Sequence, residues 1–264
     1  MLFQFYDAPD NLDTIFDFSL GNIGSHQDLP VNYIYSAKIA CSTVKATLLK
    51  DDSEPHGPFE IKFCKGKIFF KKAFFCITRN PYKRALSGYF DKISTGENTV
   101  VWPAFYKKYN LNKSNPPTFT EFLEILNKDK KQHLIDPHFR PQYLLANSKY
   151  IKPFFVGRIE RFDDVVSFLE KYNFKVIRWS PHSQKSKYSN FEFSEKQVEL
   201  IKNIYKRDFQ IYDYDLDPLS QYIPPSIYQK QKINPLFKLV ATKRSLINKV
   251  FQKVKTYKNK LKMI

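Results

Sequence analysis

Hydrophobic and polar positions along the chain form short strand-like runs, each followed by helix-like spacing. Residues 31–36 (VNYIYS) alternate as a half-buried strand does. In the strand expected at residues 73–78, positions 73–77 are continuously apolar, as expected for a strand buried on both faces. Apolar positions such as Val44 and Leu48 follow the first run at helical spacing, and residues 81–92 follow the second. Strands that alternate with helices in this way predict an α/β fold with a mainly parallel central sheet.

Helix caps mark two further elements downstream. Thr118 and Glu121 form a capping box ahead of one periodic apolar segment, and Ser194 and Gln197 form another ahead of a helix that is expected to reach Phe209. Weaker patterns predict short strands at residues 61–64, 154–157 and 176–179, and a helix that starts near Asp163 and Asp164.

Positive charge is concentrated near the C-terminal end. The formal net charge is +17, and residues 230–264 hold eleven Lys or Arg and no acid, which leaves +6 for the other 229 residues. Apolar residues such as Val250 and Val254 recur among these lysines at helical spacing. We therefore divide the chain into a folded domain, residues 1–228, and a basic amphipathic helical tail, residues 229–264. The tail either docks on an anionic membrane or partner, or is a solvated extension.

The composition argues against a membrane-spanning, an exported and a disulfide-rich protein. No stretch approaches 18 to 20 apolar residues, and the first residues, MLFQFYDAPDNLD, lack the features of a signal peptide. The three cysteines do not suggest a disulfide framework, so we expect a cytoplasmic protein, with the tail able to hold it on the inner face of the membrane. A nucleic-acid-binding protein is the alternative, but no nucleic-acid motif occurs and no such partner is expected. No cluster has the spacing of metal ligands, so no metal is expected.

The loop after the first strand carries groups that suit an anion. Residues 36–45 (SAKIACSTVK) place Lys38 ahead of Ser42 and Thr43, near the start of the helix. This is not a Walker A loop, because it has no glycine and its lysine precedes the Ser-Thr pair. A lysine, two hydroxyls and a helix start that converge on one point predict contact with phosphate or sulfate, although a solvated lysine in an ordinary loop gives the same pattern.

The second strand ends on a cation. Arg79 directly follows the strand expected at residues 73–78, Asn80 and Pro81 are a helix cap and a first-turn residue, and Ser87 comes two turns later. Ligands of open α/β sheets bind at the edge where parallel strands end, and we expect free backbone N–H groups at the helix start to favour an anion there. Arg79 and Ser87 are thus predicted to hold one phosphate. The alternative is a surface cation and a small packing residue.

Together these stretches resemble the nucleotide-binding motifs of sulfotransferases, especially the carbohydrate sulfotransferase type. Residues 79–89 (RNPYKRALSGY) meet every fixed position of the pattern R-D/N-P-Y/F-x-R-x-x-S-x-Y/F, and residues 136–142 (DPHFRPQ) are similar to D-x-H-W-x-P-Q, with Phe139 in place of Trp. The resemblance spans about residues 31–215. The first loop departs from the family, since Ala37 stands where proline is usual and a common glycine is absent.

The resemblance implies a P-loop-like three-layer fold, with a C-terminal helical extension, and an enzyme that uses 3′-phosphoadenosine 5′-phosphosulfate (PAPS). The acceptor would be a hydroxyl of a carbohydrate or glycolipid, with a protein tyrosine or a small lipid-like alcohol as alternatives. Lys38, Ser42 and Thr43 would contact the 5′-phosphosulfate, and Lys38 would stabilise the leaving group. Arg79 and Ser87 would hold the 3′-phosphate, which separates this donor from ATP. Ser186, in a late loop, is a further candidate nucleotide contact.

A histidine is expected to act as the base that takes the proton of the acceptor hydroxyl. His56 is the first candidate, because related sulfotransferases place their base about two dozen residues before the arginine that Arg79 matches. His138 is the second candidate, because its motif match is the better one, although that histidine could also contact substrate or serve the structure. A nucleotide-binding relative that has lost catalysis is the remaining alternative.

Overall fold

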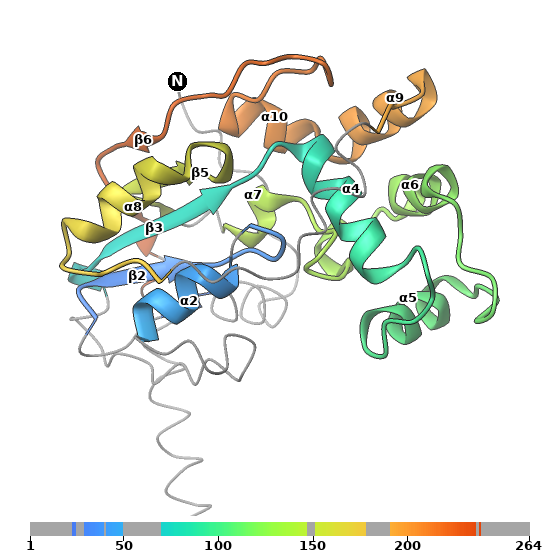
Figure 1. Cartoon of the computed structure of the whole chain (residues 1–264), viewed down its shortest axis with the longest axis horizontal. Helices are drawn as coiled ribbons and strands as arrows, with labels where there is room; N and C mark the ends of the chain where they lie inside the picture. The colour runs from blue at the N-terminus through green and yellow to red at the C-terminus, as the bar shows by residue number, and fades with distance from the viewer. Residues whose placement is uncertain are drawn as a thin grey trace, which may run out of the picture.

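The structure, a computed structural model, describes part of the 264-residue chain, in which a central sheet carries helices on both faces (Figure 1). The described residues are 23–24, 29–39, 41–49, 70–146, 151–177, 191–235 and 238.

The described sheet has five strands in the order β1-β2-β3-β5-β6. Its three central members, β2 (Val31–Ile34), β3 (Ala73–Thr78) and β5 (Phe155–Arg158), are parallel, with Val31 opposite Ala73 and Phe75 opposite Phe155. The mainly parallel sheet predicted from the sequence is therefore confirmed. Antiparallel strands of two residues close the two edges: β1 (Ile23–Gly24) and β6 (Ile227–Tyr228).

Alternate side chains of the strands supply two separate hydrophobic cores. Tyr33, Phe75 and Phe155 point to one face, where α2 (Cys41–Leu49) and α8 (Phe162–Glu170) pack against them. Phe74, Cys76 and Val156 point to the other face, toward a larger group of helices. These are α4 (Pro81–Lys92), α5 (Val101–Tyr109), α6 (Phe119–Lys128), α9 (Glu195–Ile204) and α10 (Lys206–Tyr212).

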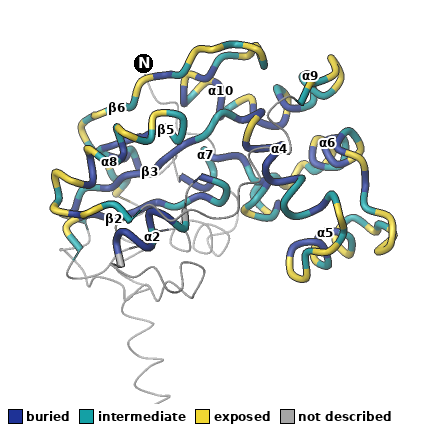
Figure 2. Tube along the Cα trace, in the orientation of Figure 1, coloured by how far each residue is buried: buried dark blue, intermediate teal, exposed yellow. Residues whose placement is uncertain are grey.

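Helix α4 connects the sheet to a helical lobe formed by α5, α6 and α9, which lies to the right in Figure 1. Its side chains are buried along most of its length, and in Figure 2 it runs dark blue between the sheet and this lobe, whose outer turns are exposed. A helix buried between two parts of a molecule can hold loops from both of them. This position makes α4 the support of the site described below.

Local sequence signals account for the starts of the main helices. The Asn80 side chain accepts hydrogen bonds from the N–H groups of Tyr82 and Lys83, and Pro81 is the first residue of α4. The capping boxes at Thr118 and Ser194 are both present. The helix expected to run from Ser194 to Phe209 is instead interrupted at Tyr205, whose carbonyl accepts the N–H of Asp208 at the start of α10.

The remaining expected elements are only partly covered. The strand expected at residues 61–64 lies outside the described residues. At residues 176–179, the first two positions are not in a strand, and the last two lie outside the described part. Short elements that the sequence did not predict complete the fold: η1 (Gln132–Leu134), α7 (Gln142–Leu145), β4 (Ile151–Lys152), η2 (Ile159–Arg161) and β7 (Lys232–Ile233).

The last described residues attach to the sheet. The side chain of Gln231 accepts the N–H of Phe74 at 2.6 Å and donates to the carbonyl of Lys72 at 3.0 Å. Most of the segment 229–264 lies outside the described residues, so the helical tail and the boundary at residue 228 stay predictions. None of the helices in the described parts combines the length and the apolar character needed to cross a bilayer.

Candidate functional site

The two loops predicted to bind an anion lie next to each other. Strands β2 and β3 are parallel neighbours, so the loops that follow them leave the same edge of the sheet. Nη1 of Arg79 donates to the backbone carbonyl of Lys38 at 3.1 Å. The sequence prediction that these two cations belong to one site requires this proximity, and the structure provides it.

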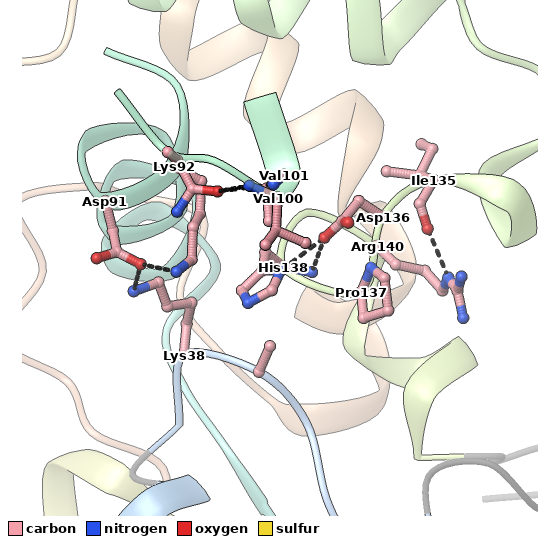
Figure 3. A network of polar contacts seen from close by, with 12 residues as sticks. Lys38, Asp91, Lys92, Val100, Val101, Ile135, Asp136, Pro137, His138 and Arg140 are labelled. Carbon is pink, nitrogen blue, oxygen red and sulfur yellow. Dashed lines mark hydrogen bonds and ion pairs between the residues drawn. The ribbon is translucent and has the colours of Figure 1, made fainter. Parts of the chain in front are cut away.

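Lys38 is held at both its backbone and its side chain. Its φ is 69°, in the left-handed region that costs most residues energy and persists only where surrounding contacts impose it. Its Nζ lies 2.5 Å from Oδ2 of Asp91, and Nζ of Lys92 lies 2.9 Å from the same oxygen (Figure 3). Burial lowers the pKa of Lys38, which Asp91 offsets only in part. Burial acts to raise the pKa of Asp91, but the two lysines outweigh it and the pKa lies below its ordinary value.

The backbone of Arg79 is fixed by a buried glutamine. Oε1 of Gln142 accepts the N–H of Arg79 at 2.8 Å, and Nε2 of Gln142 donates to the Arg79 carbonyl at 2.8 Å. Gln142 is fixed in turn by Asp208, whose carboxylate accepts the N–H groups of Gln142 and Tyr143. Burial raises the pKa of Asp208 to about 6, although these bonds act in the opposite direction. The guanidinium of Arg79 thus projects from a rigid backbone.

The start of α4 does not offer the free N–H groups that were expected to favour an anion. The side chain of Asn80 takes those of Tyr82 and Lys83, and its own N–H donates to Glu160 at 2.8 Å. That expectation was wrong because the cap that begins the helix also satisfies its donors. Any anion contacts on this side of the site would therefore come from side chains rather than from the helix start.

A third loop brings His138 to α4. Nδ1 of His138 lies 2.6 Å from Oδ1 of Asp136, which also accepts the backbone N–H of His138 at 2.8 Å. A Cβ at Gly88 would lie 3.2 Å from the His138 carbonyl, so this loop rests directly on the helix beside Ser87. In Figure 3 the second ring nitrogen of His138 is turned away from Asp136, toward the side on which Lys38 and Asp91 lie.

The Asp136 carboxylate determines which ring nitrogen of His138 acts as a hydrogen-bond donor. Burial acts to raise the pKa of Asp136, but the hydrogen bonds from His138 outweigh it and keep that pKa below its ordinary value. An ionised carboxylate only accepts hydrogen bonds, so Nδ1 of His138 donates to it. In the tautomer that this contact selects, Nε2 is the ring nitrogen that can accept a proton, as a general base requires.

Arg84 ties the first and third loops to α4. Its guanidinium is 1% exposed and donates three hydrogen bonds, to the carbonyls of Ala37 at 3.3 Å, Pro137 at 2.9 Å and Arg140 at 2.8 Å. Among the described residues no carboxylate lies within ion-pair distance of it. Burial lowers its pKa, and the charge of Asp208 counteracts this in part. One buried side chain thus sets the positions of both loops.

Comparison with known proteins gives one match. The family model described as Sulfotransferase family matches residues 31–215, more than half of the chain and the whole span of the loops described above. The chain belongs to the sulfotransferase family. No curated protein and no solved structure matches this sulfotransferase. Membership supports an enzyme that transfers sulfuryl groups, and the family implies PAPS as the sulfate donor.

The other predicted site residues of this sulfotransferase are only partly covered. Ser42 and Thr43 lie in the first turn of α2, where no acidic residue opposes an anion, and Ser87 is buried on α4. His56 and Ser186 lie outside the described residues. No group of three or more His, Cys, Asp or Glu side chains in the described parts could hold a metal ion.

Sequence reasoning did not identify three residues that the structure adds to the site. Gln142 was part of a quoted motif but was given no role, and Arg84 was a fixed motif position whose contacts with distant loops could not be inferred. Asp91 had no signal at all, since an acid in the last turns of an amphipathic helix is ordinary.

Proposed function

We propose that this sulfotransferase moves a sulfuryl group from PAPS to a hydroxyl of a carbohydrate or glycolipid. The observation that carries the proposal is the direct contact of Arg79 with the backbone of Lys38, at the edge where β2 and β3 end. PAPS has two anionic groups on one nucleoside, a 3′-phosphate and a 5′-phosphosulfate. Two fixed cations on neighbouring loops suit a ligand of this kind.

The donor-side residues divide between the two anionic groups. Arg79 and Ser87 hold the 3′-phosphate, and Ser42, Thr43 and Lys38 contact the 5′-phosphosulfate, with Ser186 as a further nucleotide contact. During transfer the acceptor oxygen bonds to sulfur as the bond from sulfur to the bridging oxygen breaks. That bridging oxygen gains negative charge and leaves with the nucleotide. In this proposal the Lys38 ammonium stabilises that charge, because transfer of a sulfuryl group depends mainly on such stabilisation and on alignment.

The acceptor proton passes to a histidine. The geometry of the described residues supports His138, because Asp136 orients its ring and Nε2 remains available as an acceptor. His56 stays a candidate, since it lies outside the described residues.

The carbohydrate or glycolipid class of acceptor rests on the motifs that resemble carbohydrate sulfotransferases. A glycolipid acceptor at the inner face of the membrane would fit the basic segment 230–264, because each lysine near an anionic surface contributes about 1 kcal/mol of attraction. We propose a cytoplasmic enzyme that contacts the membrane peripherally through this segment.

Donor recognition is testable with 3′,5′-diphosphoadenosine, the nucleotide product. At about one hundred times its dissociation constant it should stabilise the protein by about 2.7 kcal/mol, or about 5 to 10 °C in melting temperature. AMP and ATP at equal concentration should give little shift, because they lack the 3′-phosphate. Arg79→Ala should lower the affinity for 3′,5′-diphosphoadenosine about ten- to a hundredfold, since a charged hydrogen bond contributes about 1.5 to 3 kcal/mol.

Lys83→Ala is the matched control for Arg79→Ala. Lys83 is an exposed cation on α4, four positions after Arg79, and its replacement should leave the thermal shift unchanged. Equal shifts with ATP and with 3′,5′-diphosphoadenosine, or an unchanged response in Arg79→Ala, would remove the basis for a PAPS site.

The acceptor class is testable by transfer of ³⁵S-labelled sulfate from PAPS. We expect label in saccharides or glycolipids of a mixed acceptor panel, and none in tyrosine peptides or small alcohols offered at the same concentration. Label in the peptide alone would overturn the carbohydrate assignment while leaving the donor assignment intact.

A further inference from the structure

Asp91 holds the lysine that the proposed mechanism uses. Its carboxylate lies on α4, one helical turn after Ser87, and contacts Nζ of Lys38 at 2.5 Å (Figure 3). The same oxygen contacts Lys92 at 2.9 Å. Asp91 has a side-chain exposure of 30% and Lys38 one of 18%, so the pair is partly shielded from water yet open at the surface of the site.

While this ion pair is intact, Lys38 cannot direct all of its N–H groups and its charge to an anionic donor. An ammonium donates three hydrogen bonds, and the Asp91 carboxylate 2.5 Å away takes one of them and offsets the positive charge. A phosphosulfate that approached Lys38 would also meet the negative charge of Asp91 at short range. The donor must therefore separate the pair or accept a weaker contact with the lysine.

Lys92 makes the separation feasible. When Lys38 leaves, the Asp91 carboxylate keeps its partner on the same helix, so no uncompensated charge is left behind. Among the described residues Lys38 has no second carboxylate within ion-pair distance, so none of them competes with an incoming anion for the released lysine. The backbone of Lys38 stays fixed by Arg79 during this exchange, since Nη1 of Arg79 binds its carbonyl rather than its side chain.

We propose that Asp91 is a latch, a positioning residue that holds Lys38 in the free enzyme and that the 5′ group of the donor displaces. This inference rests on the proposed function, because it takes a 5′-phosphate or phosphosulfate as the competing anion. The Asp91–Lys38 ion pair neutralises the lysine in the free enzyme. It also lowers the affinity for the donor, because donor binding must break the pair.

The latch predicts that Asp91→Asn binds 3′,5′-diphosphoadenosine more tightly than the wild-type chain. A partly exposed ion pair contributes up to about 1 kcal/mol, so we expect an increase in affinity of about fivefold by titration calorimetry at fixed ionic strength. Adenosine 3′-monophosphate lacks a 5′ group that could compete for Lys38, and its affinity should not change. Asp91→Ala should behave like Asp91→Asn and provides a second variant.

A gain in affinity in Asp91→Asn could come from release of Lys38 or from loss of direct repulsion between Asp91 and the nucleotide. A double substitution distinguishes these two explanations. If Asp91 acts through Lys38, Asp91→Asn should have no effect in a Lys38→Met background. A fivefold gain that persists in that background would overturn the latch and show direct repulsion instead.

The control is Glu124→Gln, which breaks another carboxylate–lysine pair, with Lys196, on the helical lobe and should leave affinity unchanged. Unchanged affinity in Asp91→Asn overturns the latch alone. Failure of the wild-type chain to bind 3′,5′-diphosphoadenosine overturns the proposed function together with the latch.

Discussion

Replacing His138 with alanine is expected to lower kcat about 10²- to 10⁴-fold and to leave the affinity for 3′,5′-diphosphoadenosine within about twofold. A positioned general base contributes a rate factor of about this size. The cations proposed to hold the donor, Lys38 and Arg79, are anchored by other contacts, so they should keep their places when the imidazole is removed. Steady-state kinetics of label transfer and calorimetry with the nucleotide measure the two quantities separately.

Three comparisons make this prediction specific. Asp136→Asn should lower kcat by a smaller factor, because an amide can still accept from Nδ1 but no longer selects one ring form. His133→Ala is the matched control, as this histidine lies on η1 and is not part of the proposed site; its kcat should be unchanged. If His56→Ala abolishes turnover and His138→Ala does not, the base is His56.

The strands and helices that the sequence predicted well carry strong local signals. β3 is a continuous apolar run that ends at a capped helix start, and it spans Ala73–Thr78, the same residues as expected. The capping boxes at Thr118 and Ser194 fix helix starts through contacts three residues apart, which a sequence displays directly. Such elements depend little on the rest of the fold.

The elements that were missed depend on distant partners. β1 and β6 have two residues each and exist only because they pair with the edges of the central sheet. α5 begins at Val101 after an N-cap residue, Val100, whose side chain makes no capping hydrogen bond. At Tyr205 the expected single helix breaks, and the new helix start carries Asp208, which accepts the N–H groups of Gln142 and Tyr143. None of these contacts can be inferred from local spacing.

The candidate site also contains residues that the sequence predicted and residues that only the structure reveals. Lys38 and Arg79 were predicted to share a site because their two loops together resemble sulfotransferase nucleotide-binding motifs. The structure adds that the loops follow adjacent parallel strands, which end at one edge of the sheet. The residues that hold them come from far along the chain: Asp91 is 53 positions from Lys38, and Gln142 is 63 positions from Arg79. A motif identifies the groups that meet a ligand, whereas their supports become visible only in three dimensions.

Replacing Arg84 with methionine is expected to lower the free energy of unfolding by about 3 kcal/mol. Its guanidinium donates to carbonyls of Ala37, Pro137 and Arg140, and a side chain without donors leaves these three partly buried acceptors without that donor. Each unpaired buried acceptor costs about 1 to 3 kcal/mol, and the removal of a desolvated charge offsets part of the sum. Urea unfolding monitored by circular dichroism measures the change as a shift in midpoint at constant m-value.

The same variant should also lose function, because the loops of Lys38 and His138 are fixed to α4 through this one side chain. Arg84→Lys should recover little, since a single ammonium cannot reach carbonyls on two loops as a planar fork does. Lys83→Met, one position earlier and exposed, is the matched control and should change stability by less than about 0.5 kcal/mol. A fully stable Arg84→Met with unchanged nucleotide affinity would show that the loops keep their positions without the buried guanidinium.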